Sequence, residues 1–420
     1  MINIGIEIED GNYTNINLNN LDHGNPGIGG SEYLFALLAK CLSEEDFNIT
    51  VFHYGNNLLP YKVTSVILND NSELINSCER FNVDILICQV GKNEKWYRSL
   101  LKSDLKVIVW AHIYPDYKEI KSIEITDNVR RIVFVGKEQY DSYIDNDIIH
   151  KSTYIYNMIP TSYKPQKRVL TAPTVTYVGS LVHAKGFHIL AKVWKKILRK
   201  VPDAQLYVIG NGKVYDRFTK LGRYGIAEEN YEKSFIHYLT DFNGNILPSV
   251  HFLGLMGPEK NNIFNKTSVG VVNPSGLSET FCMSAVEMEY SFIPIVTLKK
   301  WGLLDTVKDK KTGLLYYTKN GLVKNIVRLL KTETLNNALG NCAHEFVVRN
   351  FTTDIQIKNW VILIRSVYLD EKQLFLKPEQ NFLNDLKWLK WVIRKIRIDF
   401  GFHSFPSYLD LKNFFKVLFK

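Results

Sequence analysis

The most informative stretch of the chain reads Asn273-Pro274-Ser275-Gly276-Leu277-Ser278-Glu279-Thr280-Phe281-Cys282-Met283-Ser284-Ala285-Val286-Glu287. The residues 268–272 before it predict a buried strand, and its Pro, Ser and Gly residues predict a loop. Phe281, Ala285 and Met288 then recur at helical spacing, which predicts a helix that begins just after Glu279 with one face in the core. A strand, a loop and a helix in this order are typical of a parallel α/β sheet.

Two carboxylates, Glu279 and Glu287, flank the first turns of the predicted helix. At a rise of about 1.5 Å per residue they lie ~12 Å apart along its axis, comparable with the distance between the sugar and the ribose of a nucleotide-sugar. The free amides of a first helical turn favour a diphosphate between them. The spacing alone favours a capping acid and a solvated glutamate on an ordinary βα unit, so the choice depends on the rest of the chain.

Length and composition indicate a soluble globular protein with two or three domains. The chain has 420 residues, of which 45% are hydrophobic and 23% are charged. No apolar run approaches the ~20 residues needed to cross a bilayer, and the first residues have a strand pattern rather than that of a signal peptide. We therefore expect a cytoplasmic protein whose five cysteines, which show no metal-binding spacing, are reduced thiols.

Most of the net charge of +9 lies in the last part of the chain, where Lys387 to Lys420 contain eight basic residues and two acids. This tail mixes Trp388 and Trp391 with lysines and arginines, which predicts a basic amphipathic helical segment over 370–420. It would either lie in a membrane interface or pack on the protein's own surface. Nucleic acid is not an expected partner, because the rest of the chain carries only about +3 and no reading module is recognisable.

Two series of short apolar runs, each interleaved with helical stretches, predict two Rossmann-like domains that face each other across a cleft. Their expected limits are 1–162 and 173–350, with an irregular linker between them and a further helix over 351–369. The predicted strands are residues 2–8, 49–54, 63–68, 83–90, 106–110 and 131–135 in the first domain, and 175–178, 204–209, 249–253, 268–272 and 293–297 in the second.

Three further motifs stand where a ligand of such sheets would bind. The glycine-rich run from Gly24 to Gly30 precedes an apolar helix and allows an anion to approach, but its order is not that of a dinucleotide fingerprint. His112 closes a buried strand, and Lys185 follows the strand that ends at Val178, where it can pair with a phosphate. Each motif has a structural alternative: a surface loop, a hydrogen-bonded core histidine or a solvated lysine.

Taken in order, these motifs resemble the GT-B retaining glycosyltransferases of family four, which build bacterial polysaccharides and glycolipids. The matching elements are Gly27-Ile28-Gly29-Gly30, Trp110-Ala111-His112, the run from Tyr177 to Gly186, Val208 to Gly212, Phe252-Leu253-Gly254, and Glu279 to Glu287. The resemblance covers residues 1–368 and implies a GT-B fold whose helix over 351–369 crosses back onto the first domain. It also implies retaining transfer of a hexosyl or N-acetylhexosaminyl group from a UDP- or GDP-linked sugar, without a metal or cofactor.

The resemblance further assigns roles to single residues. Glu279 would contact hydroxyls of the donor sugar, Glu287 the ribose hydroxyls and Lys185 the diphosphate, while His112 would lie beside the reacting sugar. The backbone groups implied in donor binding are the amides of Thr280, Phe281 and Cys282 with Gly29 and Gly30 at the diphosphate, and the backbone near Met256 at the base. Ser180 stands where the family usually has an arginine, and Thr280 and Cys282 replace two glycines.

Two other functions share the expected architecture. A non-catalytic GT-B-like binding or scaffold protein at the membrane would account for Ser180 and the replaced glycines, and a GT-B sugar-nucleotide epimerase would use the same donor site. For a glycosyltransferase, the expected partners are the nucleotide-sugar and a glycan or lipid-linked acceptor. The basic tail would place it at the inner face of the plasma membrane as a peripheral protein.

Overall fold

The computed structural model describes residues 1–12, 15–213, 219–379, 381 and 386–418, and the chain divides into two compact units. Unit 1 consists of Met1–Leu21, Ser31–Met158 and Thr353–Lys420, and unit 2 consists of Asp22–Gly30 and Ile159–Thr352. The irregular residues 163–172 therefore belong to unit 2. The glycine-rich loop also groups with unit 2, although it follows the first strand of unit 1.

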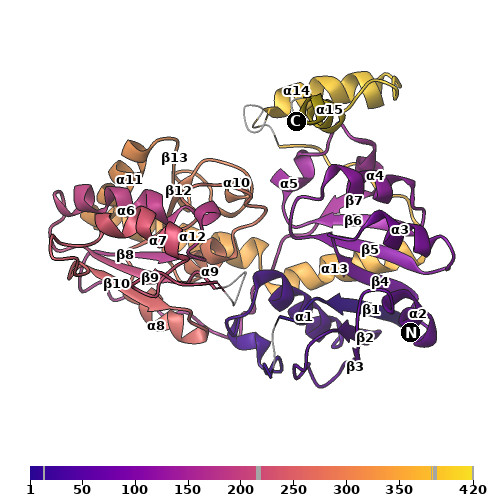
Figure 1. Cartoon of the computed structure of the whole chain (residues 1–420), viewed down its shortest axis with the longest axis horizontal. Coiled ribbons are helices and arrows are strands. Elements are labelled where there is room, and N and C mark those ends of the chain that lie inside the picture. Colours follow the sequence, from indigo (N-terminus) through magenta and orange to yellow (C-terminus); the bar gives the residue numbers. More distant parts are fainter. Residues whose placement is uncertain (13–14, 214–218, 380, 382–385, 419–420) are drawn as a thin grey trace. The chain divides into compact units, whose positions relative to one another are not determined.

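Unit 1 contains a seven-stranded parallel sheet in the order β3-β2-β1-β4-β5-β6-β7 (Figure 1). Its strands are β1 (Ile2–Ile8), β2 (Phe47–His53), β3 (Thr64–Ile67), β4 (Ile85–Gln89), β5 (Lys106–Ala111), β6 (Val129–Phe134) and β7 (Ser152–Tyr154). Its α-helices are α1 (Gly30–Leu42), α2 (Leu74–Arg80), α3 (Glu94–Leu100), α4 (Tyr117–Ile125), α5 (Lys137–Asp141), α13 (Thr353–Tyr368), α14 (Lys387–Arg394) and α15 (Tyr408–Leu418). The six predicted strands of this unit are present, and β7 is an additional strand that the sequence did not predict.

The helix predicted over 351–369 is α13, and it packs on the sheet of unit 1. Its Trp360 is fully buried, and the ring lies 5.0 Å from that of Trp110 on β5 in an edge-to-face contact. Residues at helical spacing, Ile357, Ile364 and Val367, are buried with it. This apolar stripe joins the third segment of the chain to the core of unit 1.

Unit 2 contains a six-stranded parallel sheet in the order β10-β9-β8-β11-β12-β13. Its strands are β8 (Thr174–Val178), β9 (Gln205–Ile209), β10 (Val250–Gly254), β11 (Val269–Val271), β12 (Ile295–Leu298) and β13 (Gly313–Tyr316). Its α-helices are α6 (Phe187–Leu198), α7 (Glu229–Phe235), α8 (Asn261–Phe264), α9 (Met283–Tyr290), α10 (Leu303–Thr306), α11 (Lys319–Lys331) and α12 (Glu333–Asn350). The strand β13 was not predicted from the sequence.

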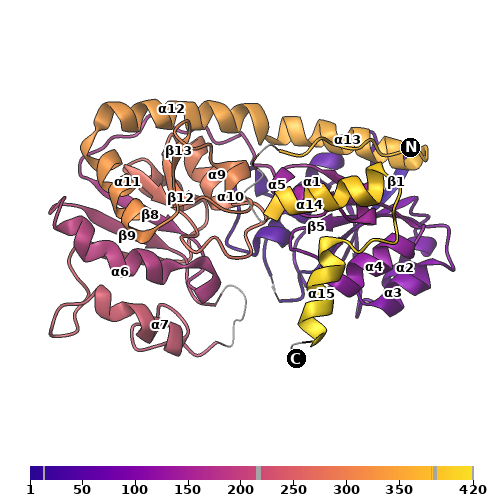
Figure 2. The same ribbon diagram turned by 90° about the horizontal axis from the view of Figure 1, so that it is seen from above.

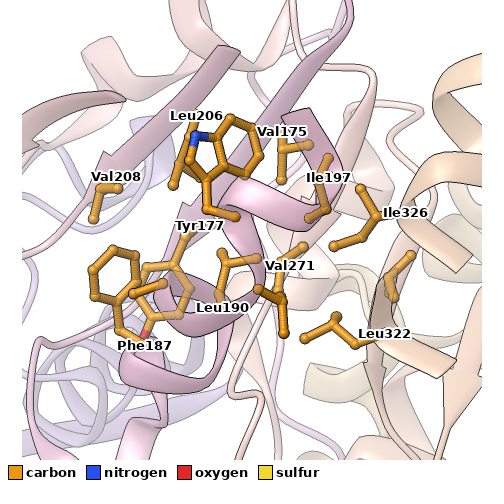
Figure 3. Packing of buried hydrophobic residues seen from close by; sticks show 14 of the residues in the cluster. Val175, Tyr177, Phe187, Leu190, Ile197, Leu206, Val208, Val271, Leu322 and Ile326 are labelled. Atoms are coloured by element: carbon orange, nitrogen blue, oxygen red, sulfur yellow. The ribbon is translucent and has the colours of Figure 1, made fainter. Parts of the chain in front are cut away.

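Unit 2 has two apolar clusters, and the larger one is formed by its sheet and the apolar stripes of α6 and α11. Figure 3 shows Val175 and Tyr177 of β8 and Leu206 of β9 beside Leu190 of α6 and Leu322 of α11. Two parallel sheets of this kind confirm the predicted α/β fold class with two Rossmann-like halves. In unit 2 the strand order reverses between β8 and β11, so the loops that follow these two strands flank the position where such sheets bind ligands.

The predicted start of the helix after Glu279 is wrong, because α9 begins at Met283. Ser278 has a φ of 53°, and the carbonyl of Glu279 accepts a hydrogen bond of 3.0 Å from the amide of Gly302. This contact with the segment before α10 holds residues 279–281 outside the helix. The ~12 Å spacing expected along a helix axis therefore does not apply to Glu279 and Glu287.

The tail packs on unit 1 through its cations. On α14, Lys387 Nζ lies 3.0 Å from Glu138 Oε1 and 2.7 Å from Asp141 Oδ2, both on α5. Of the two predicted arrangements, packing on the protein's own surface is therefore present, while residues 380, 382–385 and 419–420 of the tail lie outside the described part of the chain. Among the described residues, no helix combines the length and the apolar character needed to cross a membrane.

Candidate functional site

The loops after β8 and β11 meet at the point where the strand order of unit 2 reverses. The Ser275 hydroxyl donates a hydrogen bond to the Ala184 carbonyl, which joins the two loops. Gly186 has a φ of 72°, and a Cβ atom at this position would lie only 2.4 Å from the Ser275 amide nitrogen. The Lys185-Gly186 pair therefore has a structural reason, because only glycine combines this backbone conformation with so close an approach.

Lys185 and Glu279, both predicted site residues, are brought together by these loops. Lys185 Nζ lies 2.9 Å from Glu279 Oε2, and the side chains are 25% and 7% exposed. The same carboxylate oxygen accepts a hydrogen bond of 2.6 Å from Asn273 Nδ2, while the Lys185 carbonyl accepts one of 3.2 Å from the Tyr177 hydroxyl. The reversal point thus holds an oriented carboxylate beside a cation, which suits a ligand with both hydroxyl and phosphate groups.

Glu287 forms a second ion pair in unit 2. Its Oε1 lies 2.7 Å from Nζ of Lys260, which belongs to the 3₁₀ turn Pro258–Lys260 in the loop after β10. The same loop contains Met256, which packs on the apolar cluster that includes Cys282 and Ala285. The predicted ribose-binding acid and the predicted base-binding residue therefore lie on neighbouring segments of unit 2.

The segment Thr280, Phe281 and Cys282 is held by its side chains, all of which are buried. The Phe281 ring packs edge-to-face on that of Phe351 at 5.2 Å. The pKa of the Cys282 thiol is raised to about 12, mainly by burial and to a lesser extent by the nearby Glu279 carboxylate. This thiol therefore stays protonated near neutral pH. The two residues that replace glycines are therefore accommodated in the interior of the protein.

The glycine-rich loop is shaped by Asn25. Its Oδ1 accepts hydrogen bonds of 2.8 Å and 2.9 Å from the amides of Gly27 and Ile28, and its Nδ2 donates one of 3.0 Å to the Ile28 carbonyl. A Cβ atom on Gly27 would lie 3.5 Å from Leu255 in the loop after β10. The predicted diphosphate-binding residues Gly29 and Gly30 thus follow a turn that lies beside the Met256 segment.

Ser180 is the second residue after the end of β8. Gly179, the residue before it, has its carbonyl oxygen only 2.1 Å from the position that a Cβ atom on Gly210 would take. The glycine after β9 is therefore required for the two strand ends to lie this close. Ser180 consequently stands on a tightly packed strand end at the reversal point, as predicted, but it has a hydroxyl where the resembling family has a guanidinium.

His112 follows β5 in unit 1 and lies against aromatic rings. Its ring centre is 4.3 Å from that of Trp110 and 5.5 Å from that of Phe35, and the side chain is buried. This burial lowers the pKa of His112 to about 3. The imidazole is therefore neutral near pH 7, which suits hydrogen bonding and excludes a role as a standing positive charge.

Comparison with known proteins finds a family model that matches most of unit 2. Residues 159–346 match the model of the family described as glycosyl transferases group 1. This segment is therefore similar to the glycosyl transferases group 1 family. It contains both ion pairs described above and the helix α9.

Individual relatives are distant. An uncharacterized glycosyltransferase of Haemophilus influenzae is 23% identical over 203 residues, which are 47% of this chain and 55% of that protein. The chain matches about half the length of such curated relatives. Among solved structures, sucrose-phosphate synthase from Thermosynechococcus elongatus has a TM-score of 0.67 at 15% identity, over 88% of this chain and all of that one. A structure of Anabaena HepE with UDP and glucose has a TM-score of 0.64 at 13% identity, over 87% and 100%. These likenesses show that the chain has the GT-B fold.

Asn273 and Lys260 contact the two candidate acids, and the sequence analysis did not predict either residue for the site. Asn273 has a φ of 33° and holds Glu279, while Lys260 holds Glu287. The only signal for Asn273 was its place directly after a buried strand, where asparagine tolerates a left-handed backbone. Lys260 had the same kind of signal as Lys185, a lysine that closely follows a strand end.

Gly186→Ala is expected to destabilise the protein by more than the left-handed backbone alone explains. Gly225 has a similar φ of 69° but no atom within 4 Å of its Cβ position, so Gly225→Ala is a matched control. That control should lose about 1–2 kcal/mol in free energy of unfolding, and Gly186→Ala should lose at least about 1 kcal/mol more because of the clash with Ser275. Equal losses in urea titrations would show that the two loops do not meet as described.

Proposed function

We propose that the chain is a retaining glycosyltransferase. It transfers a hexosyl or N-acetylhexosaminyl group from a UDP- or GDP-linked sugar to a glycan or lipid-linked acceptor in bacterial polysaccharide or glycoconjugate synthesis. The observation that carries the proposal is the Lys185–Glu279 pair with Asn273 at the strand reversal of unit 2. The match of residues 159–346 to a glycosyltransferase family supports it.

In this proposal the protein lowers the barrier by stabilising charge on the departing diphosphate. Lys185 has three N–H donors, so it can keep its contact with Glu279 and still bind a phosphate oxygen. The backbone amides of residues 280–282, with Gly29 and Gly30, would supply further donors, while Ser180 contributes a hydroxyl. Preorganised donors and a cation of this kind act without a metal ion.

The two glutamates have different proposed tasks. Glu279 accepts hydrogen bonds from hydroxyls of the donor sugar. Its ion pair with Lys185 and its contact with Asn273 fix the direction of the carboxylate. Glu287 accepts hydrogen bonds from the ribose hydroxyls and is held by Lys260. Both residues lie next to the Met256 segment, which is proposed to contact the base. One acid therefore orients the group that is transferred, and the other binds the group that leaves.

His112 is proposed to bind the reacting sugar by a hydrogen bond as its glycosidic bond breaks. Because burial keeps this imidazole neutral, it can donate from one ring nitrogen without adding positive charge at the sugar. In a retaining reaction of this type the leaving phosphate would assist attack from the same face of the sugar. A cytoplasmic location, with the tail on the inner face of the plasma membrane, completes the proposal.

A panel of UDP-, GDP- and CMP-linked sugars tests donor binding, starting with UDP-sugars because the Anabaena structure holds UDP and glucose. A ligand at ~100 times its Kd stabilises the folded state by about 2.7 kcal/mol, so at least one donor should raise Tm by about 3 °C or more. Lys185→Gln should lose most of this shift, while the exposed Lys324→Gln on α11 should keep it. No shift with any donor at millimolar concentration would contradict the proposal.

A further inference from the structure

Several apolar side chains of the tail face outward, while four of its cations, Lys387, Lys390, Arg394 and Arg397, are buried. On α14, Lys387 and Lys390 are each only 2% exposed, whereas Trp388 is 50% and Val392 is 47% exposed. An ordinary amphipathic helix on a protein surface has the opposite orientation. Figures 1 and 2 show α14 and α15 next to the helices of unit 1, so this orientation belongs to a docked segment.

The inward cations are held by acids of α5 and of the 3₁₀ helix Asp147–Lys151. Lys387 pairs with Glu138 and Asp141, and Arg397 pairs with Asp147. A lysine or arginine buried in this way can leave its site only if its acids stay behind without a partner, which is strongly unfavourable. The buried cations therefore fix the outward direction of the apolar side chains.

Helix α15, which contacts α14, also exposes apolar side chains. It has no buried residue, although its last turns contain Phe414, Phe415, Val417 and Leu418 at 58%, 54%, 68% and 59% exposure. Its first turn is anchored, because the Tyr408 amide donates a hydrogen bond of 2.6 Å to Asp145 Oδ2. Three more aromatic rings between the helices are exposed, namely Phe400 at 72%, Phe402 at 63% and Phe405 at 40%.

From residue 386 to residue 418 the exposed charges are mostly positive. Lys395, Lys412 and Lys416 are exposed in the described part of the tail, while the exposed Asp399 lies 3.7 Å from Arg394. In a two-fold contact with a second copy of the chain, the same lysines would face each other. A surface of aromatic rings with lysines at its margin instead matches the headgroup layer of an anionic bilayer, where rings are buried and ammonium groups meet lipid phosphates.

We propose that the outward face of the tail is the surface by which this protein docks on an anionic lipid bilayer. This aromatic face consists of Trp388, Phe400, Phe402, Phe405, Phe414 and Phe415. The inference rests on the membrane contact in the proposed function. It assigns that contact to exposed aromatic rings instead of to the buried basic residues of α14. The basic residues of α14 hold the tail on unit 1, and the aromatic face enters the lipid interface.

The test uses the full-length protein and sedimentation with vesicles of phosphatidylcholine, alone or mixed with phosphatidylglycerol. We expect binding to the mixed vesicles and weak binding to phosphatidylcholine alone. The double variant Phe414→Ser/Phe415→Ser should bind at least about tenfold more weakly, because two exposed rings no longer enter the interface. Phe242→Ser removes a ring that is 98% exposed in unit 2, and this matched control should bind like the wild type.

Several results would overturn the inference. These are no sedimentation of the wild type with the mixed vesicles, equal binding by the Phe414/Phe415 variant, or an equal loss in Phe242→Ser. Light scattering that shows a dimer which this variant dissociates, without vesicle binding, would assign the face to a second copy instead. Unchanged Tm values would show that the variants are folded. Since no sugar donor is present, failure here is distinguishable from failure of the donor-binding test.

Discussion

Glu279→Gln is expected to lower kcat by about 10²–10³ and to leave thermal unfolding nearly unchanged. In the wild type, Lys185 Nζ and Asn273 Nδ2 lie 2.9 Å and 2.6 Å from Glu279 Oε2. The amide of glutamine has the shape of the carboxylate, so the side chain can stay between these two residues. The amide accepts hydrogen bonds from hydroxyls more weakly than the carboxylate does, and it no longer balances the charge of Lys185. The proposed orientation of the donor sugar would be lost in the transition state, and release of nucleoside diphosphate during transfer measures this loss.

Two other acids make this result specific. Glu287→Gln should raise KM for the donor more than it lowers kcat, because ribose hydroxyls are bound equally in the ground state and the transition state. Glu345→Gln removes a carboxylate whose side chain is 61% exposed on α12, and it should change neither parameter. A wild-type kcat in the Glu279 variant, with the protein folded, would contradict the role proposed for this residue.

The sequence predicted the elements that bear the site better than the contacts within it. Eleven strands were predicted from apolar runs, and all are present, because a buried strand of a parallel sheet reads as a continuous apolar segment. The missed strand β7 reads Ser-Thr-Tyr and has no aliphatic residue, and β13 reads Gly-Leu-Leu-Tyr directly after the polar run 309–312, so neither stands out as an apolar run. Lys185 and Glu279 were both predicted, but their contact depends on how two loops distant in sequence meet.

Two further features depend on contacts with distant parts of the chain. The start of α9 depends on a hydrogen bond from Gly302, which no pattern within residues 273–287 contains. The orientation of the side chains of α14 could not be predicted from the sequence of the tail either. Amphipathic spacing shows that α14 has two faces, but only the acids of α5, such as Glu138 and Asp141, determine that the cations face inward. In both cases the deciding partner lies outside the segment that is read.

Lys92→Met is expected to lower the free energy of unfolding by about 3–5 kcal/mol, because it leaves a buried acid without its cation. Lys92 lies just beyond the end of β4, and its Nζ is 2.7 Å from Glu7 Oε1 and 2.8 Å from Glu9 Oε1. The side chains of Lys92 and Glu7 are 1% and 0% exposed. Lys95→Met, an exposed change on α3 of the same unit, should stay within about 0.5 kcal/mol of the wild type in urea titrations.

The destabilisation should also depend on pH. Burial raises the pKa of Glu7 above its ordinary value, and removal of Lys92 takes away the attraction that lowers it. A carboxyl group whose pKa is higher in the folded state binds more protons there, so its contribution to stability falls as pH rises above the unfolded pKa. The loss in free energy of unfolding caused by Lys92→Met should therefore be larger at about pH 8 than at about pH 5.

Adding Glu7→Gln to Lys92→Met should remove most of this pH dependence and recover part of the stability, because no buried charge then remains unpaired. Equal deficits at both pH values would mean that Lys92 acts by packing alone.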